Sequence, residues 1–171
     1  MNPRYFQMMA RYHARANDAV YDACAQLTDE QRRKDMGAFF GSIHNSLNHI
    51  LVVDRLWTDR FVGAPNRGYK HRTIISEDFA ELRGLQKEHD QRVINFTNDM
   101  TKENIMSPLS WSMIDGTAME VPHRVMVYTQ LFNHGTHHRG QVHCLLTQLG
   151  QEGPVLDVPP VLMDEMFNAY H

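Results

Sequence analysis

The sequence predicts an all-α four-helix bundle with one short β-hairpin between the third and fourth helices. Four long segments repeat apolar residues at the spacing of an amphipathic helix, whereas one short stretch alternates with a period of two. Glycines, prolines and helix-capping residues separate these segments. Four amphipathic helices bury their apolar stripes by packing together as a bundle. At 171 residues the chain is expected to form one domain, over residues 1–171.

The first helix is expected over residues 4–27, where Tyr5, Tyr12 and other apolar residues recur at helical spacing. Thr28 is followed three positions later by Gln31, a capping-box pattern that predicts a short helical turn.

The second helix is expected over residues 38–62, after a break at Gly37. The segment 63–68 contains two glycines and a proline and is the clearest loop in the sequence. The third helix is expected to begin near Ser76 and to end near Met100.

The hairpin is expected from two alternating segments, 109–113 and 117–121, on either side of an Asp-Gly turn. The fourth helix is expected over residues 123–149, with Gly150 as its stop signal. The segment 151–160 is rich in proline and glycine, and residues 161–169 are expected to form a last short helix.

Three histidines lie within five residues on the fourth predicted helix: His134, His137 and His138. On a helical wheel centred on Leu131, His138 lies about 20° from the buried stripe's centre, His134 about 60° and His137 about 120°. His134 and His138 therefore project inward side by side, whereas His137 leans toward the edge with Gln141. Imidazole is the commonest metal-ligating side chain, so this i/i+4 pair predicts two ligands to one ion.

The second predicted helix offers His44 and His49 as a third ligand. Neither lies at the centre of the helix's apolar face, since His44 is about 90° to one side and His49 about 130° to the other. Residues 50–53 are apolar on all sides, so the helix is expected to be buried there. His49 adjoins that buried section, which favours it, and His44 stays as the alternative.

Asp54 lies near the centre of the same apolar face, where a carboxylate needs a partner. One interpretation is that it accepts from a histidine N–H and so orients a ligand, or that it serves as a base. The alternative is that it pairs with an arginine. His89, on the third helix, is interpreted as a satisfied core residue.

Composition excludes several classes of protein. The formal charge of −3 and the pI near 6.4 argue against nucleic acid as a partner. No apolar run approaches the roughly 20 residues that span a bilayer. With only Cys24 and Cys144, the sequence predicts no disulfide framework, and the chain is expected in a reducing cytoplasm.

Three motifs, taken in order, resemble the DinB (damage-inducible) family of the DinB/YfiT-like metal-binding four-helix bundles. They are the segments 14–17, 39–57 and 134–141, and their order and approximate spacing match across nearly the whole chain. The resemblance implies a site of three histidines, one from the second helix and two from the fourth: His49, His134 and His138. It also implies up-down-down-up helix order and a homodimer formed through exposed helix surface.

Three neutral imidazoles leave at least one position on a divalent ion for water or substrate. Zinc and nickel both suit imidazole, and iron is not excluded. The wider group that the chain resembles includes thiol-dependent transferases and a hydrolase-like branch. We therefore expect a metal-dependent S-transferase that uses a low-molecular-weight thiol, or a hydrolase. The alternatives are a non-catalytic metal-binding stress-response or sensor protein, and a helical interaction module that binds no metal.

Overall fold

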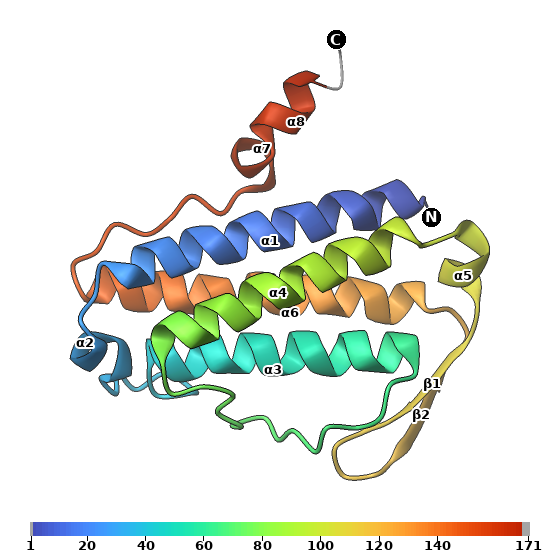
Figure 1. Cartoon of the computed structure of the whole chain (residues 1–171), viewed down its shortest axis with the longest axis horizontal. Coiled ribbons are helices and arrows are strands. Elements are labelled where there is room, and N and C mark those ends of the chain that lie inside the picture. The colour runs from blue at the N-terminus through green and yellow to red at the C-terminus, as the bar shows by residue number, and fades with distance from the viewer. Residues whose placement is uncertain (1, 169–171) are drawn as a thin grey trace.

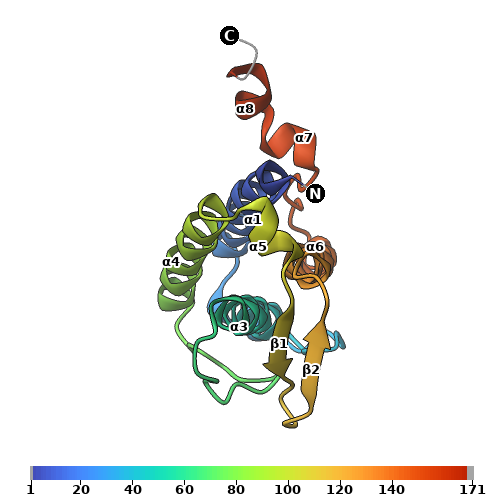
Figure 2. The same cartoon turned by 90° about the vertical axis from the view of Figure 1, so that its right-hand side faces the viewer.

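The structure is a computed structural model, and it describes residues 2–168. Its four long helices are α1 (Pro3–Ala25), α3 (Ile43–Val62), α4 (Phe79–Asn98) and α6 (Val125–Gln148), packed side by side (Figure 1). Helices α1 and α3 each pack against both α4 and α6, so α1 and α3 occupy opposite corners of the bundle (Figure 2). The colours of Figure 1 show α1 and α6 running one way and α3 and α4 the other. This confirms the up-down-down-up order.

Because α3 and α4 run in the same direction, the chain between them must return along the length of the bundle. Residues 63–78 make this return beside α3 (Figure 1). Gly63 ends α3 with a φ of +67°, a left-handed conformation that suits glycine. Four short helices complete the described chain: α2 (Asp29–Arg33), α5 (Lys102–Met106), α7 (Val158–Val161) and α8 (Met163–Asn168).

Capping side chains set the starts of the second and third long helices, and the sequence placed both starts too early. Ser42 accepts from the backbone N–H of Asn45, while Ala38 and Gly41 form a bridged turn, so α3 begins at Ile43 and not at residue 38. The side chain of Asp78 accepts from the backbone N–H of Glu81, so α4 begins three residues after Ser76. The capping box predicted at Thr28 is present and starts α2.

Three short helices differ from what the sequence predicted. Helix α5 was not predicted. The last three residues of the proline- and glycine-rich segment 151–160 belong to the short helix α7. A separate helix, α8, covers much of the expected range 161–169, and residue 169 lies outside the described chain. Tyr5, one of the residues that recur at helical spacing in the predicted first helix, is 43% exposed, whereas Phe6 is buried.

The predicted hairpin is present as β1 (Leu109–Ser112) and β2 (Ala118–Val121), paired antiparallel with Leu109 opposite Val121. Gly116, at its turn, has a φ of +88°. The hairpin packs on the bundle: the Trp111 ring meets the Trp57 ring of α3 edge-on, 5.7 Å between centroids. This contact gives a marginal two-stranded sheet the support that it needs.

A polar layer divides the core into two apolar clusters. One cluster includes Phe6, Phe61, Tyr128 and Phe132, and the other includes Val20, Leu51, Val142 and Leu146. On each long helix, buried polar residues lie between the parts that enter these two clusters: His13, Asn17, Asp54, Gln86, His89, Asp90, His138 and Arg139. None of the helices in the described chain combines the length and apolar character that crossing a bilayer requires.

Candidate metal centre

The structure brings together the three histidines that the resemblance implied. His49 comes from α3, and His134 and His138 come from adjacent turns of the neighbouring helix α6. Each offers a ring nitrogen, and these nitrogens lie within 4.8 Å of one another. The three form a candidate metal-binding group at the edge of the polar layer.

In His49 and His138, hydrogen bonds determine which ring nitrogen is free to bind a metal ion. His49 donates from Nδ1 to the carbonyl oxygen of His71, at 2.9 Å, and His138 donates from Nδ1 to Oε1 of Gln141, at 2.8 Å. Each ring is thereby left with a free lone pair on Nε2.

The Nε2 atoms of His49 and His134 are 3.1 Å apart. Zinc–nitrogen bonds of about 2.0–2.1 Å in a tetrahedral site place two nitrogens about 3.3–3.4 Å apart. The spacing of these two atoms therefore fits two ligands of one ion.

The three imidazoles are held neutral. Burial lowers the pKa of His49 to about 4. Burial, together with the neighbouring His138, lowers the pKa of His134 to about 3. Burial also lowers the pKa of His138. Because a metal binds the neutral ring, no proton has to be removed for binding near neutral pH.

The other candidate histidines lie elsewhere. His44 is fully buried, and its Nε2 donates to the carbonyl oxygen of Ser76, so it does not join the group. His89 is buried and lies 3.2 Å from the hydroxyl of Thr58, in agreement with its interpretation as a core residue. His137 is exposed, and its Nε2 accepts from the side-chain amide of Gln141.

Asp54 is fully buried, and its partner is a histidine that sequence reasoning missed. Oδ2 of Asp54 lies 2.9 Å from Nε2 of His13, on α1. Arg139 lies 3.1 Å from the other ring nitrogen of His13, and since a guanidinium only donates, that nitrogen accepts. His13 therefore donates from Nε2 to Asp54. The sequence suggested a ligand histidine or an arginine as the hydrogen-bond partner of Asp54. The partner found in the structure, His13, is neither.

The charge on Asp54 is stabilised in spite of its burial. Burial alone would raise its pKa, but the His13 ring, through its electrostatic interaction with the carboxylate and its hydrogen bond to it, outweighs that effect and lowers the pKa to about 2. Gln86 also donates to Oδ2 of Asp54, at 3.1 Å. The carboxylate is thus ionised in the middle of the bundle.

Gly135 allows His13 to approach α6. A Cβ atom at this position would lie 2.6 Å from Cε1 of His13 and 2.9 Å from Nη1 of Arg139. A side chain here would force the His13 ring away from its two partners. The signal for His13 was available in the sequence, because it lies four positions before Asn17 on the buried side of α1.

The environment of Asp90 predicts that the free energy of unfolding depends on pH. Its Oδ1 accepts from Asn17 and from Gln86, each at 2.9 Å. Burial raises the pKa of Asp90 to about 7. Between about pH 4 and pH 7 the folded protein keeps a proton that the unfolded chain has lost, so its free energy of unfolding falls as the pH rises.

An Asp90→Asn variant keeps the accepting oxygen and cannot ionise. We expect its advantage in unfolding free energy over the wild type to grow from pH 5 to pH 7 and then level off, approaching about 4 kcal/mol. Urea denaturation of both metal-free proteins at several pH values measures this difference. A difference that stays constant across the range would contradict the assignment.

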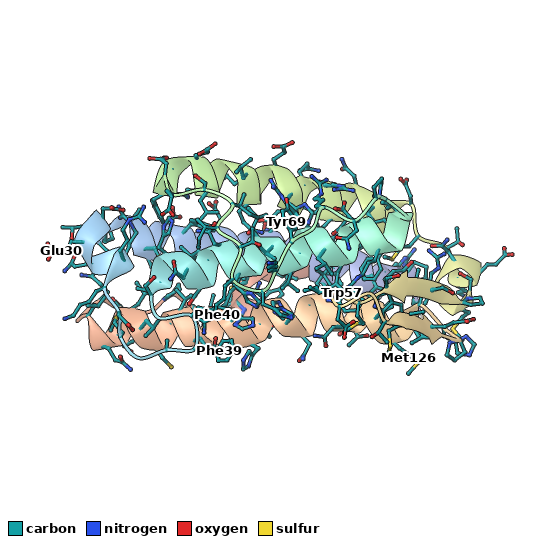
Figure 3. The ribbon with its side chains drawn as sticks, turned by 90° about the horizontal axis from the view of Figure 1, so that it is seen from below. Glu30, Phe39, Phe40, Trp57, Tyr69 and Met126 are labelled. Atoms are coloured by element: carbon teal, nitrogen blue, oxygen red, sulfur yellow. The ribbon has the colours of Figure 1, made fainter. Side chains whose placement is uncertain are left out.

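A cavity of about 1160 Å³ opens directly beside the three histidines. Helices α3 and α6, the segment 70–72 and the hairpin turn border it, and most of its exposed wall surface is apolar. Phe40 stacks on the His49 ring at 3.9 Å between centroids and also borders the cavity. Figure 3 views this side of the bundle, with Phe39 and Phe40 set apart from Trp57, which lies toward the hairpin.

The fold and the site together define a class: an up-down-down-up helical bundle with a candidate three-histidine metal site between its second and fourth long helices. The family model described as the DinB family matches residues 1–165, and the chain belongs to that family. The resemblance seen in the sequence is thereby confirmed.

Two relatives agree with this assignment. The chain is 27% identical to Protein DinB of Bacillus subtilis (strain 168) over 150 residues, which cover 81% of this chain and 83% of that protein. A DinB-like protein from Bacillus cereus ATCC 10987, known from its crystal structure, matches with a TM-score of 0.62 at 17% identity. That match covers 82% of this chain and 89% of the other and shows the shared fold.

Proposed function

We propose that this protein binds a divalent transition metal, zinc or nickel, through Nε2 of His49, His134 and His138. We further propose that it is a metal-dependent enzyme, a transferase that acts on a low-molecular-weight thiol or a hydrolase. The observation that carries the proposal is the convergence of three neutral imidazoles at the wall of a large cavity. Three neutral protein ligands are typical of catalytic sites that keep an open position.

When bound, such an ion supplies a Lewis acid that lowers the pKa of a thiol or of water. The chain's own residues hold the ligands in place. The carbonyl oxygen of His71 and the side chain of Gln141 fix the His49 and His138 rings through their Nδ1 protons. Fixed rings present their lone pairs in one direction, which raises the affinity for the ion.

Asp54 fits a positioning role toward His134. Within the described chain, Oδ1 of Asp54 and Nδ1 of His134 are both buried and lack hydrogen-bond partners. The charge of Asp54 acts on His134 and raises its pKa, against the larger effect of burial. Ligation through Nε2 requires the His134 proton at Nδ1, where a nearby carboxylate stabilises it. We propose that Asp54 serves this purpose and is not the base.

The cavity favours catalysis over metal storage or sensing, because its wall includes all three ligand histidines and leaves them accessible to a small molecule. A protein that only stores an ion gains nothing from a large open space at the ligand atoms, and a closed four-ligand site would hold the ion more tightly. The non-catalytic stress-response or sensor protein is the alternative outcome of the test below.

We expect the zinc- or nickel-loaded protein to accelerate one of two reactions. In the first, a thiol such as cysteine or glutathione attacks 1-chloro-2,4-dinitrobenzene: a C–S bond forms, chloride leaves and the thiol proton passes to solvent. In the second, water cleaves 4-nitrophenyl acetate to acetate and nitrophenol. Absorbance follows both products, and chelation with EDTA should abolish the acceleration. Metal-loaded protein that accelerates neither reaction would favour the non-catalytic alternative.

A further inference from the structure

The wall of the cavity beside the histidines carries an excess of positive charge. Its cations are Arg60, Lys70 and Arg72, and its one carboxylate belongs to Asp115. The three ligand histidines are neutral, so they do not offset this charge and would not offset that of a divalent ion. The electrostatic potential inside the cavity therefore attracts anions.

Hydrogen bonds and aromatic rings hold the two arginines in place, and no carboxylate neutralises their charge within the described residues. Arg72 donates to the carbonyl oxygen of Phe39, at 2.8 Å, and lies over the Phe39 ring. Arg60 donates to the carbonyl oxygen of Ser112, at 3.1 Å, and lies over the Trp57 ring. Within the residues that the structure describes, neither guanidinium forms an ion pair. Each keeps further N–H groups for an anionic ligand.

Arg72 is the cation best placed to act together with the histidine group. It lies 5.9 Å from the centroid of the Phe40 ring, and that ring stacks on His49. Arg72 and Lys70 also flank His71, whose carbonyl oxygen accepts from the His49 ring. Arg72 and the His49 ring therefore both lie beside the Phe40 ring and border the same cavity.

Part of the wall is apolar and exposed to solvent. Phe39 is 70% exposed, and Met113 and Ile114 on the hairpin turn are 41% and 38% exposed. These side chains border the same cavity as Trp57. Apolar surface gathered around a few charged groups is typical of a site for a small organic ligand.

We infer that the cavity binds an amphipathic organic anion, whose carboxylate or similar group contacts Arg72 and Lys70 while its apolar body lies against Phe39, Trp57 and the hairpin turn. In that position the ligand's reactive group can reach the three histidines. The inference deepens the proposed function by naming its substrate class. The charge preference itself depends on the two cations and does not require a metal.

Three probes with one apolar body test the charge preference: 3-phenylpropionate, 3-phenylpropan-1-ol and 3-phenylpropylamine. Isothermal titration of the full-length zinc-loaded protein should show the carboxylate binding about tenfold more tightly than the alcohol, and the amine more weakly than either. Acetate, which lacks the apolar body, should bind at least about tenfold more weakly than 3-phenylpropionate. Equal affinity for the carboxylate and the alcohol, or for acetate and 3-phenylpropionate, would overturn the inference.

Variants show which residues cause the preference for the carboxylate. Arg72→Gln should remove most of the preference for the carboxylate, and Lys70→Gln should remove part of it. Arg4→Gln, which removes an exposed arginine outside the cavity, should leave it unchanged. Metal analysis of each sample checks that zinc is retained. A preference that survives both Arg72→Gln and Lys70→Gln would come from the zinc alone and would overturn the role of the cations.

The metal-free protein separates this inference from the proposed function. If the wild type takes up no zinc, the metal proposal fails, and the same titrations on metal-free protein still decide the question of the anion. A preference that depends on Arg72 would support the inference in that case as well. Its absence would overturn it.

Discussion

A His138→Ala variant is expected to lose its divalent ion. The wild type, purified without a histidine tag, should hold about one ion per chain, and the variant should bind it at least about 100-fold more weakly. This is a minimum, because even the loss of a group that only orients a ligand costs about 10- to 100-fold in affinity. Mass spectrometry of the metal content measures the difference directly.

Chelation gives a second readout of the same prediction. An ion present at about 1,000 times its dissociation constant stabilises the folded state by about 4 kcal/mol, which raises the melting temperature of a chain of this size by roughly 10 °C. EDTA should therefore lower the melting temperature of the wild type and leave that of the His138→Ala variant nearly unchanged.

His137→Ala is the matched control, since His137 is the exposed neighbour on the same helix and bonds only to Gln141. It should keep the ion and its sensitivity to EDTA. A His138→Ala protein that binds as much metal as the wild type would show that the ligand assignment is wrong. A wild type that binds no transition metal, with a melting temperature that EDTA does not change, would remove the metal site altogether.

An Arg139→Met variant is expected to be about 3–5 kcal/mol less stable than the wild type, because it removes one partner from a buried network of charges. Arg139 is 1% exposed and donates to His13, at 3.1 Å, and to Asn17, at 2.9 Å. Without it, the charge of Asp54 stays buried and Nδ1 of His13 loses its donor. Urea denaturation in the presence of EDTA measures this loss independently of the metal.

Two further variants show whether the loss comes from the buried charge. In the double variant Asp54→Asn/Arg139→Met both charges are absent, so at least half of the lost stability should return. Arg33→Met removes a guanidinium that pairs with Asp29 and Glu77 at the surface, and it should cost no more than about 1 kcal/mol. If Arg139→Met costs no more than Arg33→Met, the buried network does not contribute as described.

Local patterns in the sequence were sufficient for the helices and the hairpin, whereas the up-down-down-up order was implied by the family resemblance. The helical spacing of apolar residues located the four long helices, and the Asp-Gly turn between alternating segments located the hairpin. The errors lay at the ends, as at residue 38, where a turn and the Ser42 cap delay the start of α3. A cap competes with helix extension over only a few residues, so periodicity places an end less accurately than a centre.

The sequence by itself also determined two of the three histidines of the candidate site. His134 and His138 lie on one helix, and the regular 100° step fixes their relation without reference to any other part of the chain. The choice of His49 over His44 needed the family resemblance, because the wheel put both away from the centre of their face. Only the packing of α3 against α6 brings the His49 ring to the other two.

The tertiary structure alone decided the partners of the buried polar groups and the shape of the cavity. His13 meets Asp54 across 41 positions of sequence and Arg139 across 126. Periodicity describes which side of one helix is buried, but it carries no information about how far a helix is rotated or shifted against its neighbours. Contacts between helices depend on that rotation and shift, which the packing of the whole core sets.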